Sequence, residues 1–72
     1  MSEFGDRLKM AMAVSGVRNG ELARLSGVDP QQISHLTGKQ REPAFPTLQA
    51  ILRALPNVDA RWLILGDQRA TV

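Results

Sequence analysis

The chain has 72 residues and a formal net charge of +2, a length that allows one domain, near the lower limit at which an apolar core alone holds a fold. It contains no cysteine and one histidine, which excludes a disulfide framework and an ordinary zinc site, and we expect no cofactor. No apolar run approaches the roughly 20 residues that span a bilayer, and the acidic N-terminus lacks the form of a secretory signal, so we expect a cytoplasmic protein without a membrane segment.

The N-terminal third of the chain predicts two helices. Ser2 can cap a first helix that runs to about Ser15 and stops at Gly16. Its inward face consists of apolar residues at helical spacing, which are Phe4, Leu8, Ala11 and Met12. A second helix begins near Asn19, whose short amide can act as the cap, and ends before Gly27, where a left-handed cap lets the chain turn sharply.

A third helix is expected over about residues 30–37. Asp29 has the form of its N-cap, Pro30 suits the first helical position, and Gln32 completes a capping-box pattern. Ile33 and Leu36 fall on one face of this helix. We expect this face to pack against three apolar residues of the preceding segment, which are Leu22, Leu25 and Val28.

The rest of the chain predicts a loop over residues 38–45, two further helices and a tail. Pro46 opens the fourth helix, in which Leu48, Ile51, Leu52 and Leu55 recur at helical spacing. Asp59 caps a short fifth helix that ends before Gly66. No strand-like alternation is long enough to build a sheet. The sequence therefore predicts an all-α domain of five short helices over residues 1–66, followed by a short polar tail over residues 67–72.

The second and third predicted helices, joined by a glycine turn, have the outline of a helix-turn-helix. Ala23, Gly27, Ile33 and Leu36 match the spacing of the lambda-repressor/Cro-like (XRE) family of helix-turn-helix regulators, and Leu22 and Val28 fit its accessory apolar positions. Residues 3–9, 38–43 and 60–66 resemble the first helix, the basic loop and the closing segment of that family. The resemblance thus covers nearly the whole chain and implies a compact lambda-repressor-like domain with the helix-turn-helix formed by helices 2 and 3.

The resemblance implies that the third helix lies in the DNA major groove and reads base edges. Gln31 and His35 share its outward face, beside Gln32, and we expect these three side chains to contact bases. A glutamine can bind adenine through two hydrogen bonds, which is worth about 1–3 kcal/mol of discrimination. The alternative is that all three are solvated side chains, with Gln32 serving as part of the cap.

Phosphate contacts are expected on both sides of the groove, because such contacts fix register without reading sequence. The candidates are Arg18, Asn19, Ser34, Thr37, Lys39, Gln40 and Arg41. Four basic and two acidic residues lie between Arg18 and Arg41, an excess of two, whereas five of each sign lie outside this segment. The whole net charge therefore falls in the predicted DNA-binding segment. The alternative for Lys39 and Arg41 is an ordinary solvated loop.

Two interpretations compete for the only tryptophan. Trp62 is a candidate core residue, because large aromatic side chains dominate small cores. In some relatives the matching segment forms a dimer face, to which Trp62, Leu63 and Leu65 would then belong. Met10 and Met12 are expected to fill gaps in the packing.

The function that these patterns favour is sequence-specific binding of double-stranded DNA by a homodimer that regulates transcription, a repressor by association with the family, bound to the nucleoid in the cytoplasm. One alternative is the antitoxin of a toxin–antitoxin pair, although the sequence contains no evident toxin-binding extension. Another is a protein-interaction module on the same fold. An enzyme is not expected, because the chain has no cysteine nucleophile and no glycine-rich phosphate loop.

Overall fold

The computed structural model describes residues 4–38 and 42–66, and within them it contains five helices and no strand. These are α1 (Phe4–Ser15), α2 (Asn19–Ser26), α3 (Pro30–Gly38), α4 (Phe45–Ala54) and α5 (Ala60–Leu65). The expected all-α class is confirmed, with α3 reaching Gly38 and α4 beginning at Phe45, one residue before the expected proline. In this part of the chain, no helix has the length and apolar character needed to cross a membrane. The predicted start at Ser2 and the predicted tail lie outside the described residues.

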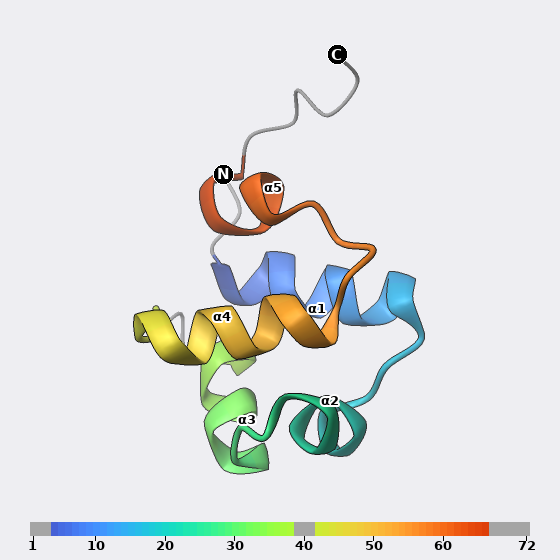
Figure 1. Ribbon diagram of the computed structural model, residues 1–72, viewed down its shortest axis with the longest axis vertical. Coiled ribbons are helices and arrows are strands. Elements are labelled where there is room, and N and C mark those ends of the chain that lie inside the picture. Colours follow the sequence, from blue (N-terminus) through green and yellow to red (C-terminus); the bar gives the residue numbers. More distant parts are fainter. Residues whose placement is uncertain (1–3, 39–41, 67–72) are drawn as a thin grey trace.

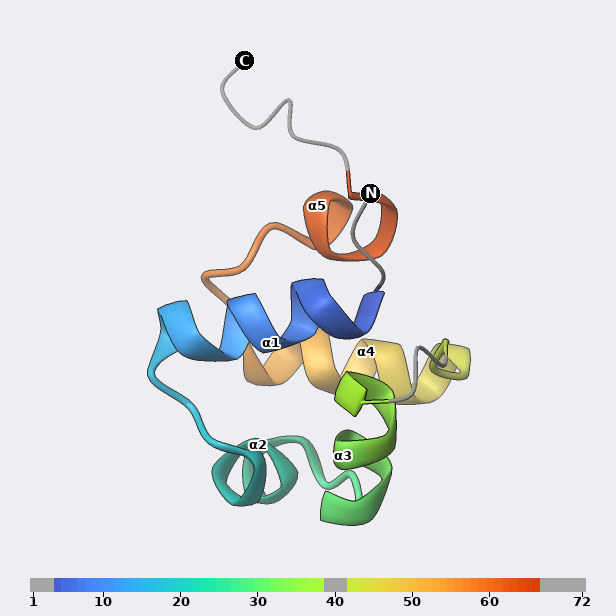
Figure 2. The same cartoon turned by 180° about the vertical axis from the view of Figure 1, so that it is seen from behind.

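The helices form three tiers along the long axis of the molecule (Figure 1). α1 and α4 make up the middle tier, α2 and α3 lie on one side of it, and α5 lies on the other. Seen from behind, α1 runs between α5 and the α2–α3 pair (Figure 2). Contacts of α1 with both α3 and α5 agree with this view. α1 therefore joins the two ends of the molecule.

One apolar core holds the tiers together. Leu8, Leu22, Ile33, Ile51 and Leu63 are fully buried in it, so that each helix supplies at least one side chain. The predicted inward face of α1 is confirmed, because all four of its residues are buried. Burying one such aliphatic side chain stabilises the fold by about 1.5–3 kcal/mol. The helices of this small chain therefore depend on one another rather than on their own propensities.

Two apolar residues that we expected inside are exposed. Leu25 is 50% exposed and Met10 is 54% exposed. The buried residues of α2 are Leu22 and Ala23. At about 100° per residue, Leu25 points roughly 60° away from Leu22, on the side opposite Ala23. The packing of Leu25 against α3 was therefore a wrong prediction, caused by the phase of the helix rather than by its hydrophobicity.

The turn between α2 and α3 follows the predicted local signals. Gly27 adopts a left-handed conformation with φ 77°, and its N–H donates to the Ala23 carbonyl oxygen at 2.8 Å. Asp29 accepts a hydrogen bond from the N–H of Gln31 at 2.8 Å, which confirms it as the cap. The Gln32 side chain is exposed and makes no return bond to Asp29 among the described residues. The capping box is therefore only half formed.

α1 approaches the C-terminal end of α3 closely at Gly5. A Cβ atom at this position would collide with the Leu36 carbonyl oxygen and would lie 3.3 Å from the Thr37 carbonyl oxygen. Both obstacles are backbone atoms, which cannot move aside as a flexible side chain can. Gly5 therefore sets how closely α1 supports α3, a role that the sequence analysis did not identify.

Arg7 holds the opposite end of the molecule together. Its side chain is buried, Nε donates to the Leu63 carbonyl oxygen at 2.9 Å, and Nη2 donates to the Ile64 carbonyl oxygen at 3.1 Å. These carbonyls belong to the last turn of α5, where a positive charge and extra donors stabilise a helix end. At the other end of α5, Asp59 accepts from the Trp62 N–H, as predicted. A cap and a buried guanidinium thus fix this six-residue helix.

Candidate nucleic-acid interface

α3 has one apolar face directed into the core and one polar face directed outward. Ile33 and Leu36 are 0% and 3% exposed. The outward face carries four exposed polar side chains, which are Gln31, Gln32, Ser34 and His35. None of the four is an acidic residue, a lysine or an arginine. α2 and α1 both pack against the inner side of α3. The predicted base-contacting residues therefore lie on a supported surface open to a partner.

Part of this surface forms a shallow hollow. Pro30, Gln31, Ser34 and His35 line an open depression of about 340 Å³ on the outer side of α3. Gln32 does not line it, although its side chain is also exposed. The structure thus brings together two of the three predicted base-contacting residues and places Gln32 beside them.

A hydrogen bond between side chains joins the start of α2 to the middle of α3. The Asn19 Nδ2 donates to Ser34 Oγ at 3.0 Å. Asn19 was expected to cap α2, but the N-cap is Arg18, which makes no side-chain cap bond. The amide of Asn19 is instead turned toward α3, because this residue already belongs to the first helical turn. Two predicted phosphate-contacting residues are therefore neighbours on one edge of the α3 surface.

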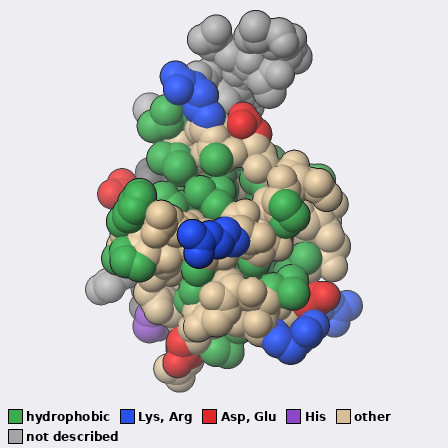
Figure 3. Space-filling model, viewed as in Figure 1, with side chains coloured by type: hydrophobic (Ala, Val, Ile, Leu, Met, Phe, Trp, Pro, Cys, Tyr) green, Lys and Arg blue, Asp and Glu red, His purple; other side chains and the backbone are tan. Residues whose placement is uncertain are grey.

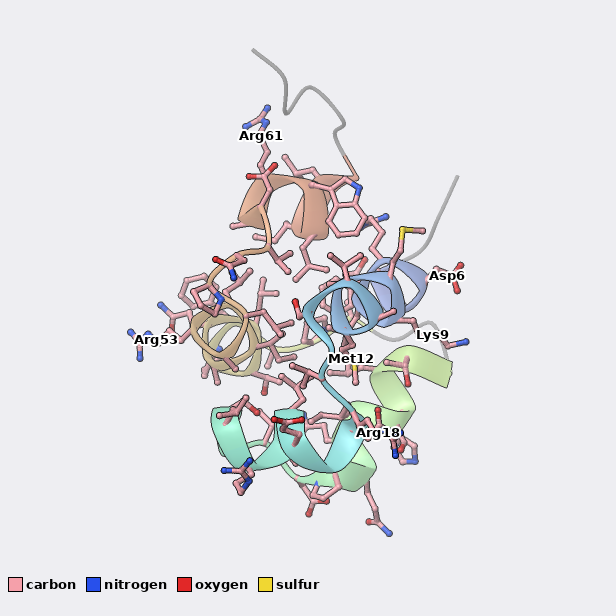
Figure 4. All side chains as sticks on the ribbon, turned by 90° about the vertical axis from the view of Figure 1, so that its right-hand side faces the viewer. Asp6, Lys9, Met12, Arg18, Arg53 and Arg61 are labelled. Atoms are coloured by element: carbon pink, nitrogen blue, oxygen red, sulfur yellow. The ribbon has the colours of Figure 1, made fainter. Side chains whose placement is uncertain are left out.

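The other predicted phosphate-contacting residues are less uniform. Arg18 is exposed and lies on the α3 side of the molecule, away from Arg53 (Figure 4). Thr37 is half-buried, and its hydroxyl donates to the carbonyl oxygens of Ile33 and Ser34 at 3.1 and 3.2 Å. The remaining candidates, Lys39, Gln40 and Arg41, lie outside the described residues.

The formal charges of the described helix-turn-helix sum to zero. Arg24 lies 3.9 Å from Glu21 in an exposed pair within α2, and such pairs contribute little energy. With Arg18 and Asp29, the described part of the helix-turn-helix carries two charges of each sign. The excess of two over residues 18–41 therefore comes from Lys39 and Arg41, which lie outside the described residues. On the face that α4 crosses, basic side chains are scattered among hydrophobic ones rather than clustered (Figure 3). This face offers no evident basic patch in the part of the chain that is drawn in colour.

The residues expected at a dimer face differ in exposure. Leu65 is 61% exposed and Trp62 is half-buried against the core, which agrees with the core interpretation of the tryptophan. Leu63 is fully buried, so its side chain packs within its own chain and was misassigned to that face. The described residues contain no group of three His, Cys, Asp or Glu side chains placed to hold a metal ion.

Comparison with known proteins gives consistent matches. A family model described as helix-turn-helix matches residues 15–63. Three relatives are each 37% identical over 67 residues, and they are the HTH-type transcriptional regulators for conjugative elements R391 of Providencia rettgeri, SXT of Vibrio cholerae and pMERPH of Shewanella putrefaciens. The aligned part covers 93% of this chain and 30% of each relative, so the chain spans less than a third of their length. No solved structure is significantly similar to the chain.

Proposed function

Because the chain belongs to the helix-turn-helix family, of the lambda-repressor/Cro (XRE) type, we propose that it is a sequence-specific regulator of transcription that binds duplex DNA with α3 in the major groove. The observation that carries this proposal is the two-sided character of α3. Ile33 and Leu36 are buried while four polar side chains face outward. A helix of this kind presents hydrogen-bonding groups to base edges on a rigid support.

The roles within the interface follow from chemistry and position. Gln31 and His35 contact base edges from the centre of the α3 surface, and Gln32 contacts a base from beside them. Arg18, Asn19, Ser34 and Thr37 contact phosphates along the edge that the Asn19–Ser34 hydrogen bond joins. Lys39, Gln40 and Arg41 supply further phosphate contacts and, through the two basic residues, the net positive charge of the segment.

A single domain with two excess charges gains little electrostatic affinity for DNA. We therefore include a homodimer in the proposal, with two α3 helices that read half-sites about one helical turn, or 34–36 Å, apart. Trp62 and Leu65 contribute to the contact between the two copies. The protein acts as a repressor, bound to the nucleoid in the cytoplasm.

Selection of binding sites from a random duplex library tests this function. The expected result is an enriched sequence with two-fold symmetry, and an affinity that falls with salt at a log–log slope of about −0.9 per neutralised phosphate. Enrichment of no sequence, together with no detectable binding at low salt, would contradict the proposal and favour a protein-interaction module on the same fold.

A further inference from the structure

The hollow on α3 has a chemistry that restricts which base pair it can receive. We propose, on the basis of the function above, that the hollow takes the C5-methyl group of a thymine and that Pro30 is the residue that contacts it. The half-site would then contain a T·A pair at this position, beside the base that Gln31 reads. Pro30 becomes a specificity-determining residue although its side chain cannot form a hydrogen bond.

Pro30 is suited to this contact by its position and by its side chain. It is the first residue of α3, it is one of the four residues that line the hollow, and it is exposed. In the major groove, thymine alone presents a methyl group, whereas cytosine presents an amino donor at the neighbouring position. A proline ring can bury the methyl group but leaves the amino group without a partner, so it favours thymine over cytosine.

The polar lining of the hollow supports the same choice. Gln31, Ser34 and His35 line the hollow together with Pro30, and among the residues that the structure describes no arginine or lysine lines it. The described lining therefore supplies no guanidinium or ammonium group, which is the group that most commonly reads guanine. Gln31 follows Pro30 directly in the chain and can bind an adenine of an adjacent pair, so the two residues together favour consecutive A·T pairs.

The ring is also held in place. Asp29 accepts from the Gln31 N–H at 2.8 Å, which fixes the backbone on both sides of Pro30. The next turn of α3 is anchored by Ile33, whose side chain is fully buried and whose N–H donates to the Asp29 carbonyl oxygen at 3.1 Å. A fixed apolar contact can distinguish a methyl group from a hydrogen atom, because the ring cannot move to fill the space.

Replacement of thymine by deoxyuridine tests the proposal, because it removes only the methyl group. Each thymine of the selected duplex is replaced in turn, and affinity is measured for the wild-type chain, for Pro30→Ala and for Gln49→Ala. Loss of one buried methyl group is expected to weaken wild-type binding about fourfold at one position per half-site. In Pro30→Ala, the ratio of the affinity for the thymine duplex to that for the deoxyuridine duplex should fall toward one. Alanine is tolerated at the first helical position but does not reach the methyl group.

Gln49→Ala is the control, because Gln49 is exposed on α4, does not line the hollow and has no place in the proposed interface. It should keep the fourfold ratio. If the duplex is bound tightly and no deoxyuridine replacement weakens binding, the hollow does not receive a methyl group, although the proposed function stands. A ratio that survives in Pro30→Ala would assign the methyl contact to another residue. If no duplex is bound at all, the proposed function and this inference both fail.

Discussion

The two ends of the molecule are held by different kinds of interaction. At the α2–α3 end, contacts between residues close in the chain set the geometry, such as the Gly27 turn and the Asp29 cap. At the α5 end, Arg7 makes a contact between residues distant in the chain, because it donates to a carbonyl oxygen 56 residues away. The comparison shows that the surface proposed to bind DNA is organised locally, whereas its position relative to α5 depends on α1.

The largest effect on the free energy of unfolding is expected from a substitution where α1 meets α3. Gly5→Ala places a methyl group against the Leu36 carbonyl oxygen, and overpacking against rigid atoms costs about 1–3 kcal/mol or more. The free energy of unfolding from urea denaturation measures this loss. Gly20→Ala is the matched control, because that glycine is helical and a Cβ atom there meets no other atom within 4 Å. We expect the control to be neutral or stabilising by about 0.4–1 kcal/mol.

The second prediction tests the α5 end. Arg7→Met keeps a long apolar stem in the buried site but removes the donors to the Leu63 and Ile64 carbonyl oxygens. We expect a loss of about 1–3 kcal/mol in the free energy of unfolding, and faster amide hydrogen exchange in α5 than in α3. Arg53→Met removes an exposed arginine and should stay within about 0.5 kcal/mol of the wild type. Equal losses in the free energy of unfolding for the two variants would show that the hydrogen bonds of Arg7 do not stabilise α5.

The third prediction concerns specificity at the α3 end. Gln31→Ala removes a bidentate partner from the outward face and should relax discrimination at one base position by about 1–3 kcal/mol. The side chain is exposed, so the free energy of unfolding should change little. Comparing the selected-site profile of this variant with that of the wild type measures the effect, and an unchanged profile would show that the reading face is misplaced.

The smallest change in affinity for DNA is expected when a phosphate contact is removed. Lys39→Ala or Arg41→Ala should weaken binding to all sequences alike and reduce the magnitude of the salt slope by about 0.9 for each bound subunit. Affinity for the selected duplex and for an unrelated one, measured over a range of salt, separates this outcome from a loss of sequence reading. A loss confined to the selected duplex would make either residue a base contact.

The sequence was sufficient to predict the five helices and the caps at Asp29, Asp59 and Gly27 because their signals are local, whereas the expected cap at Asn19 was wrong. Asp29 and Asp59 each precede their helix directly, and Gly27 follows α2. The Leu25 prediction failed because a hydrophobic residue near the edge of the buried arc of a helix can face either way. Gly5 and Arg7 were missed because their partners are carbonyl oxygens of distant helices, and backbone atoms leave no pattern in residue types.

The candidate interface was similarly predictable only in part. Helical spacing identified the outward face of α3, because Ile33 and Leu36 fix which side is buried. The bond between Asn19 and Ser34 was not predicted, although both were expected to contact phosphates, because it joins exposed side chains 15 residues apart. The hollow required coordinates, since it depends on how four neighbouring side chains are directed.

The central claim is that the outward side of α3 contacts duplex DNA. Backbone amide chemical shifts of the chain, recorded by NMR as the selected duplex is added, test this claim most directly. We predict the largest shift changes at Asn19, Gln31, Ser34 and His35, and small changes at Arg53 and Arg61. Changes centred on α4 or α5, with the α3 amides unaffected, would contradict the account.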